Sequence, residues 1–221
     1  MSSSTPSRVP GARRTPVQAR STERVNRIIA ATTGLIAEAG VDAATTSAIA
    51  RRARISLASL YRYFPNRNAV LVAVAERQFE RLSRRLEEFL ETFDLNRGLD
   101  RLLDAYLEFY RLEPGYAELW AGLQAIPELH ELDLQDLYRN ARAISRRARR
   151  DFPGIGEERL WNMAVMLTRA CGAVLRLAMT MPAEQAEPLV QELKRMVRCY
   201  LQGEADRAQA GTGLRGAPTG G

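Results

Sequence analysis

The stretch "TTSAIARRARISLASLYRYFPNRNAVL" (residues 45–71) predicts two short helices joined by a tight turn. Thr45 and Ser56 are residues of the kind that precede helices, because their hydroxyl oxygens accept hydrogen bonds from backbone amides of the first turn. Pro65 ends the second helix. Ala50 is small where the two helices would approach each other most closely. This spacing predicts a helix-turn-helix, whose second helix enters the major groove of DNA while the first supports it from behind.

The outward face of that second helix carries the candidate DNA contacts. Ser59 and Arg62 are expected to reach base edges or phosphates, Tyr61 to donate its hydroxyl to a phosphate, and Leu57 or Ala58 to touch a thymine methyl group. A solvated helix face is the competing interpretation of the same residues. The full set of predicted DNA-contacting residues is Thr45, Thr46, Ser56, Leu57, Ala58, Ser59, Tyr61, Arg62, Tyr63 and Arg67.

The flanks of the two helices complete this prediction. Thr45 and Thr46 offer free backbone amides and hydroxyls to a phosphate at a helix N-terminus, and Arg67 adds a cation beside them. Phe64 and Tyr63 are expected to pack in the core or at the hinge, although Tyr63 borders the DNA-facing set.

Positive charge is concentrated in the first third of the chain. The 221 residues carry a net charge of +6, yet residues 1–67 alone hold eleven arginines against three acidic residues. The remainder is therefore slightly acidic. This asymmetry indicates that a polyanion, either nucleic acid or an anionic membrane, docks on the N-terminal third. A basic surface that serves only solubility is the alternative.

The chain between residues 21 and 202 shows the helical period of apolar residues in almost every segment and the alternation of a strand in none. The expected fold class is all-α. Residues 1–20 and 203–221 are poor in large apolar residues and are expected to be disordered, the first as a basic arm that either enters a minor groove or adds nonspecific attraction. Helices are expected at about 21–39, 45–53, 56–64, 66–93, 97–112, 115–125, 128–150, 157–180 and 184–201.

Two further features bear on the compartment. No run of about 18 apolar residues predicts a membrane span, and no secretory signal is recognisable, so a cytoplasmic location is expected. Cys171 and Cys199 lie within apolar helical patterns and are interpreted as buried free thiols.

The helix-turn-helix region resembles the DNA-binding signature of the tetracycline-repressor (TetR) family of bacterial transcriptional regulators. The resemblance implies a homodimeric repressor that binds a palindromic operator through residues 21–66 and is released by a small molecule. Residues 67–202 would then form a helical domain for effector binding and dimerisation. The matching residues, within roughly residues 21–75, are Ile49, Ala50, Ala53, Ser56, Leu60, Tyr61, Phe64 and the basic Arg67 three positions later.

Two positions depart from the family pattern. Arg54 stands where the family usually has glycine, in a turn that often needs a left-handed backbone, at a cost of about 1 kcal/mol. Ala58 also replaces a frequent glycine and brings a methyl group toward the groove. These departures leave the DNA-binding prediction in place but weaken any inference about the operator sequence.

The last two long helices are the expected dimer interface. The segment "LWNMAVMLTRACGAVLRLAMTM" (residues 160–181) is apolar on more than one face, and two such helices from each chain would form a four-helix bundle. Burial within a monomer is the alternative. Arg169 and Arg176 are charges one heptad apart on this apolar helix, and they either pair across the dimer, which we favour, or hold an anionic effector. The residues assigned to the interface are Arg169, Gly172, Arg176, Leu193 and Val197.

A ligand pocket is expected among the middle helices, where aromatic residues concentrate. Core packing is the alternative for each of them. The predicted pocket residues are Tyr106, Tyr110, Trp120, Tyr138 and Trp161.

Other function classes have weaker support in the sequence. The single histidine, His130, has no neighbouring cysteine or histidine that would suggest a metal site or a catalytic triad, and no glycine-rich phosphate loop occurs, so no enzyme, metal or cofactor is predicted. A non-enzymatic scaffold that docks its basic region on an anionic membrane remains the second hypothesis. The first helix argues against it, because its apolar stripe consists of Val, Ile, Thr and Ala rather than bulky membrane-binding residues.

Overall fold

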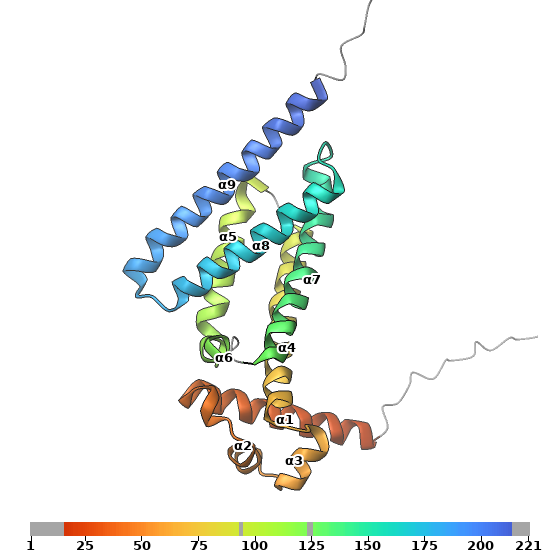
Figure 1. Cartoon of the computed structure of the whole chain (residues 1–221), viewed down its shortest axis with the longest axis vertical. Helices are drawn as coiled ribbons and strands as arrows, with labels where there is room; N and C mark the ends of the chain where they lie inside the picture. The colour runs from red at the N-terminus through yellow and green to blue at the C-terminus, as the bar shows by residue number, and fades with distance from the viewer. Residues whose placement is uncertain (1–15, 93–94, 123–125, 214–221) are drawn as a thin grey trace, which may run out of the picture.

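The computed structural model describes residues 16–92, 95–122 and 126–213 of the chain (Figure 1). Throughout these ranges the regular secondary structure is helical, as the sequence predicts. The elements are α1 (Pro16–Ala39), the 3-10 helix η1 (Val41–Ala43), α2 (Thr46–Arg52), α3 (Leu57–Tyr63), α4 (Arg67–Glu91), α5 (Leu95–Leu112), α6 (Tyr116–Gly122), α7 (Pro127–Asp151), α8 (Glu157–Met179) and α9 (Ala183–Gly213).

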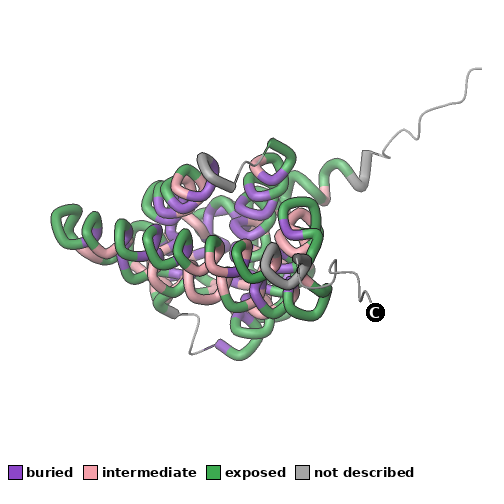
Figure 2. The backbone as a smooth tube through the Cα atoms, turned by 90° about the horizontal axis from the view of Figure 1, so that it is seen from above, coloured by how far each residue is buried: buried purple, intermediate pink, exposed green. Residues whose placement is uncertain are grey.

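Helices α1, α2 and α3 form a small bundle at one end of the molecule, and α4 leads from it into the larger helical body (Figure 1). The small bundle closes around apolar side chains that every one of its helices contributes. Ile28, Ile36, Ile49, Leu60 and Leu71 have 0% exposed surface. Viewed along the long axis, buried residues line the interior between the helices and exposed residues line the outside (Figure 2). This packing fixes α3 against a rigid support.

The short segment between α5 and α6 joins the two parts of the molecule. Gly115 has a φ of 69°, and a Cβ atom there would lie 3.1 Å from Cγ2 of Ile36 and 3.2 Å from the backbone oxygen of Thr33, both in α1. Helix α4 holds the same segment, because Nε2 of Gln78 donates to the backbone oxygen of Pro114 at 3.0 Å. Helix α6 therefore begins directly on the small bundle, as Figure 1 shows.

Both ends of the helical region extend beyond the expected limits. Helix α1 begins at Pro16 rather than near Ser21, with proline at the first helical position, where its missing N–H costs nothing. The rest of the predicted N-terminal arm, with Arg13 and Arg14, lies outside the described residues.

The prediction that disorder starts at Gly203 is wrong for the first part of that tail. Helix α9 continues to Gly213. Glu204 is 2% exposed and accepts hydrogen bonds from Arg159 of α8 at 2.8 Å, which anchors the extra turns to the preceding helix. A side-chain ion pair across two helices is a contact that local composition does not reveal.

Helix α8 has the length and composition of a membrane span, yet its contacts are those of a core helix. It packs against α5, α7 and α9, and its Arg169 pairs with the buried Asp133 of α7. Only 28% of its most apolar window is buried, however, so much apolar surface of α8 faces outward. The cysteine prediction also needs correction. Both thiols are free, but Cys171 is half-buried and Cys199 is exposed.

Candidate DNA-binding surface and effector cavity

The helix-turn-helix is held by two side-chain caps and one strained turn. The Oγ1 atom of Thr45 accepts from the backbone N of Ala48 at 3.2 Å, and Oγ of Ser56 accepts from the backbone N of Ser59 at 3.1 Å. Arg54, between them, has a φ of 54°, so the expected left-handed turn is present without the glycine. Each cap uses one lone pair of the hydroxyl oxygen of Thr45 or Ser56, and the hydroxyl hydrogen can donate to a phosphate.

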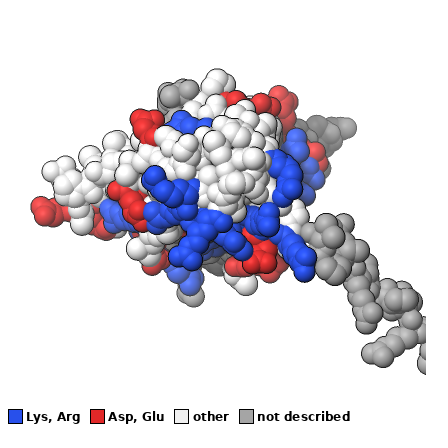
Figure 3. All heavy atoms as spheres, turned by 90° about the horizontal axis from the view of Figure 1, so that it is seen from below, with Lys and Arg blue, Asp and Glu red and all other residues white. Residues whose placement is uncertain are grey.

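The face of α3 that points away from the bundle is exposed and lies among arginines. Leu57 and Tyr61 are 40% and 47% exposed, and Ala58 and Arg62 are exposed as well. Viewed from the α1–α3 end, the molecule shows an uncharged patch bordered by basic side chains (Figure 3). The exposed arginines of this end are Arg20, Arg24, Arg27, Arg51, Arg52, Arg54 and Arg62.

Neighbouring side chains set the positions of several α3 residues. The hydroxyls of Thr46 and Tyr61 lie 3.5 Å apart, which places the N-terminus of α2 beside the exposed ring. Nη1 of Arg24 donates to Oγ of the half-buried Ser59 at 3.4 Å. Arg24 of α1 thus belongs to the surface although sequence reasoning missed it, because the residue lies outside the helix-turn-helix pattern.

The guanidinium of Arg67 is held by the segment that precedes α2. Its Nε donates to the backbone oxygen of Ala44 at 3.0 Å, and Nη2 donates to that of Val41 at 2.5 Å, with the Asp42 carboxylate 3.5 Å away. These donors tie α4 to η1 and to Ala44, the residue that follows it. A contact of Arg67 with DNA stays a prediction.

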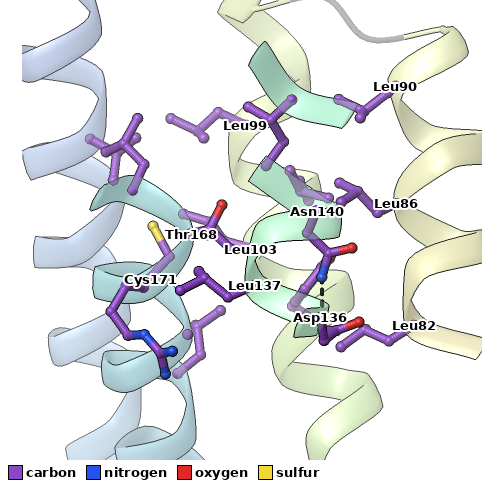
Figure 4. A pocket seen from close by; sticks show the side chains of 18 of the residues that line it. Leu82, Leu86, Leu90, Leu99, Leu103, Asp136, Leu137, Asn140, Thr168 and Cys171 are labelled. Atoms are coloured by element: carbon purple, nitrogen blue, oxygen red, sulfur yellow. Dashed lines mark hydrogen bonds between the residues drawn. The ribbon is translucent and has the colours of Figure 1, made fainter. Parts of the chain in front are cut away.

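The C-terminal body contains a cavity of about 160 Å³. Leucines of α4, α5 and α7 line most of it, facing Thr168 and Cys171 of α8 (Figure 4). On α4 the lining runs from Phe79 to Leu90, which places the two ends about 16 Å apart along the helix. Burial raises the pKa of the Cys171 thiol to about 11, so this side chain lines the cavity in its neutral form. The site is narrow, elongated and mostly apolar.

Two of the five predicted pocket residues line this cavity. They are Tyr106 and Tyr110, whose rings meet edge to face with centroids 6.1 Å apart. Trp120 lies just behind the lining, stacked on Tyr116. Tyr138 and Trp161 are elsewhere: they stack on each other at 6.0 Å on the outside of α7 and α8, and Tyr138 is 44% exposed.

The residues predicted for the dimer interface point into their own chain. Arg169, Gly172 and Arg176 line the cavity, and Leu193 and Val197 are 3% and 2% exposed in the core. The apolar stripe of the last helix that holds Leu193 and Val197 therefore packs inward. The outward apolar residues of α8 and α9 are instead Met166, Ala173, Leu177, Met196 and Cys199.

Most polar groups of the cavity have partners. Nη1 of Arg169 donates to Asp133 at 2.7 Å. Asp136 accepts from Oγ of Ser83 at 3.1 Å and from Nδ2 of Asn140 at 2.9 Å, and burial raises the pKa of its carboxyl despite the nearby Arg139.

The hydroxyl of Thr168 is a buried polar atom with no hydrogen-bond partner within the described ranges. Arg176 places its guanidinium 3.8 Å from the ring centroid of Trp120, next to the hydroxyls of Tyr110 and Tyr116.

Comparison with known proteins identifies this combination of an N-terminal helix-turn-helix and a hollow helical body. Residues 28–74 match the family model described as bacterial regulatory proteins, tetR family, and residues 94–201 match the model described as tetracyclin repressor-like, C-terminal domain. The chain belongs to the TetR family. Family membership makes it a DNA-binding transcriptional regulator, as its helix-turn-helix indicates.

Individual TetR-family relatives agree over different lengths. The HTH-type transcriptional repressor KstR of Rhodococcus jostii is 41% identical over 63 residues, which are 28% of this chain and 30% of the relative. KstR of Mycobacterium tuberculosis is 38% identical over 60 residues, which are 27% of each chain. The matched region thus spans less than a third of these curated relatives.

Solved TetR-family structures extend the likeness to most of the chain. A regulator from Streptomyces coelicolor is 27% identical, with a TM-score of 0.60 over 81% of this chain and 98% of that one. A regulator from Pectobacterium atrosepticum has a TM-score of 0.67 over 84% of this chain and 96% of that one, at 17% identity, and supports the fold alone.

Proposed function

We propose that the chain is a homodimeric repressor that reads a palindromic operator with α3 and is released from it by a small molecule in the cavity. The observation that carries the DNA-reading part is the exposed face of α3, with Tyr61 and Arg62 among arginines and behind them a fully buried Leu60. Such a face presents both base-reading and phosphate-binding groups on a rigid support. The KstR relatives, which are named as repressors, share this part of the chain.

A second copy of the chain is the natural occupant of the outer face of α8 and α9. Met166, Leu177 and Met196 are 46%, 53% and 50% exposed, and such large apolar side chains cluster at interfaces. Met166, Ala173 and Leu177 lie one above the other on α8 at helical spacing. Two reading heads related by a two-fold axis would match a palindromic site.

Coupling between cavity and DNA would run through the start of α6. Tyr116 lines the cavity and stacks on Tyr110 at 4.7 Å, while the preceding Gly115 packs against α1. A ligand that moves Tyr116 therefore shifts the contact between α6 and α1. This shift changes the spacing of the two DNA-binding parts in the dimer. Only a ligand with different affinities for the two spacings releases the DNA.

The membrane-scaffold hypothesis has less support than DNA binding. Ile28, Ile29, Thr32 and Ile36 of α1, which would have to face lipid, are buried in the core of the small bundle.

DNase I footprinting on the DNA upstream of the chain's own coding region tests the proposal. We expect one protected segment with two inverted half-sites whose centres lie about 34–36 Å apart or a multiple of that. Arg62→Ala should lose this protection at equal protein concentration, because Arg62 supplies about 1–3 kcal/mol if it reads a base edge. Uniform protection of all DNA, unchanged in the variant, would contradict sequence-specific reading.

A further inference from the structure

We propose that Arg176 binds the anionic group of the effector, and that the effector is an amphipathic carboxylate whose apolar chain lies along the leucines of the cavity. The inference rests on the proposed effector role of the cavity and names the class of molecule that fits it. Three features carry it: the charge balance of the lining, the position of Arg176 and the shape of the apolar part.

The charge balance singles out Arg176 among the ionic groups of the cavity. Arg169 is paired with Asp133, and Arg147 with Asp151 at 2.8 Å. In the parts of the chain that the structure describes, no carboxylate lies within ion-pair distance of Arg176, whose guanidinium lies beside the Trp120 ring and the hydroxyls of Tyr110 and Tyr116. A ring face stabilises a cation without neutralising it.

The cavity also carries two acids besides Asp151, and neither competes for Arg176. Asp133 is engaged by Arg169, and Asp136 is surrounded by Ser83, Asn140 and Arg139 as donors. A cationic ligand would find both acids already satisfied. An anion would instead complete the pair that Arg176 lacks, and a guanidinium matches a carboxylate with two parallel hydrogen bonds.

Gly172 makes room for the guanidinium. A Cβ atom at this position would lie 3.0 Å from Nη1 and 3.2 Å from Nη2 of Arg176, so the arginine folds back along α8 over the glycine. The unpartnered Thr168 hydroxyl lies one helical turn further along the same face, about 6 Å away along the axis. The anionic group therefore has a charged donor and, within reach, a neutral one.

The apolar part extends away from this polar end. Trp120 contacts Phe79 edge to face at 6.5 Å, which places Arg176 at the Phe79 end of the lining on α4. From there the cavity runs past Leu82 and Leu86 to Leu90, as Figure 4 shows. An extended apolar chain fits this channel, with its anionic end next to Tyr116 and the start of α6.

Tryptophan fluorescence tests the assignment directly. The chain has two tryptophans, so Trp161→Phe leaves Trp120, beneath Arg176, as the single reporter. We would titrate this protein with sodium decanoate and with 1-decanol, which has the same chain without the charge. We expect saturable binding of decanoate that is at least about tenfold tighter than that of 1-decanol, because hydrogen bonds to charged groups are the stronger ones.

Arginine variants in the same background show which residue reads the charge. Arg176→Gln should bring the two affinities to within about threefold of each other, whereas Arg176→Lys, which keeps the charge, should retain part of the preference. Arg169→Gln, on the same helix, should keep the preference, since Arg169 is already paired. Thermal melting by circular dichroism checks that each variant folds. If Arg176→Gln does not fold, the affinities of Arg176→Lys for the two probes test the proposal instead.

Several outcomes would overturn the proposal: equal affinities of decanoate and 1-decanol, a preference that survives in Arg176→Gln, or no saturable binding of either probe. Repeating the titration on protein bound to fluorescent operator DNA separates this proposal from the regulatory one. Decanoate that binds through Arg176 but leaves the DNA bound supports the ligand class and contradicts release by the cavity.

Discussion

Arg54 and Arg67 carry the same charge but have different structural roles: Arg54 forms a left-handed turn, and Arg67 donates hydrogen bonds to backbone oxygens. The family resemblance implied a left-handed turn at Arg54, and its φ of 54° lies in that region. Arg67 was assigned to DNA as a cation beside the N-terminus of the preceding helix, and it also matched a family position. Its partners in the structure are the backbone oxygens of Ala44 and Val41, 23 and 26 positions earlier in the chain. A turn conformation follows from local geometry and was predictable, whereas a contact between distant segments was not.

Arg54→Gly should stabilise the protein. Glycine relieves the strain of a left-handed backbone, so we expect the free energy of unfolding to rise by about 1 kcal/mol. Urea denaturation measures it. Arg51→Gly is the matched control, since it makes the same change inside α2 and should cost about 1 kcal/mol. Equal effects at the two positions would show that Arg54 is not strained.

Arg67→Met should lower the free energy of unfolding by about 1–3 kcal/mol, because the carbonyl groups of Val41 and Ala44 lose a charged donor. Operator affinity measured well below the melting temperature should change less than in Arg62→Met, which removes an exposed arginine. A variant with native stability and lost DNA binding would return Arg67 to the DNA surface.

At the scale of elements, apolar periodicity and capping residues predicted the helices and their order. They did not predict where α1 begins, where α9 ends, or which faces of α8 and α9 are buried. The end of α9 depends on the ion pair between Glu204 and Arg159 across helices. The inward stripe of α8 was taken for an interface, because periodicity tells which residues share a face but not what that face packs against. Trp120 was expected to line the cavity because aromatic residues concentrate in the middle helices, but it lies behind the lining.

The segment that begins α6 gives a prediction at this scale. Gly115→Ala should destabilise the protein by about 1–3 kcal/mol, since it adds a methyl group 3.1 Å from Ile36 and places alanine at a positive φ. Differential scanning calorimetry provides the measurement. Gly203→Ala, in a helix with open space around it, should instead stabilise by up to about 1 kcal/mol. Similar melting temperatures for both variants would mean that α6 is not tightly seated on α1.

On the scale of the whole molecule, the sequence predicted a basic reading head joined to a helical body, and the TetR-family likeness extends to 98% of a solved relative. The cavity could not be placed from sequence beyond Tyr106 and Tyr110. Its outline depends on where leucines from α4, α5 and α7 leave space, which is a property of three-dimensional packing.

Leu177→Arg should break the proposed dimer. The side chain is 53% exposed in the single chain, so the arginine costs little in the monomer but would be desolvated at the interface of two copies. Sedimentation velocity should show a monomer and operator affinity should fall with it. Arg195→Glu on α9 is a control for surface charge. An intact dimer in Leu177→Arg would exclude the outer face of α8 as the interface.

The most direct test of the central claim is fluorescence anisotropy of the protein on labelled DNA from upstream of its own coding region, with scrambled DNA beside it, at two salt concentrations. We expect tight binding to the first DNA alone at the higher salt, and loss of that preference in Tyr61→Ala/Arg62→Ala while the variant remains folded. Equal and salt-sensitive binding to both DNAs, unchanged in the variant, would contradict sequence reading by α3.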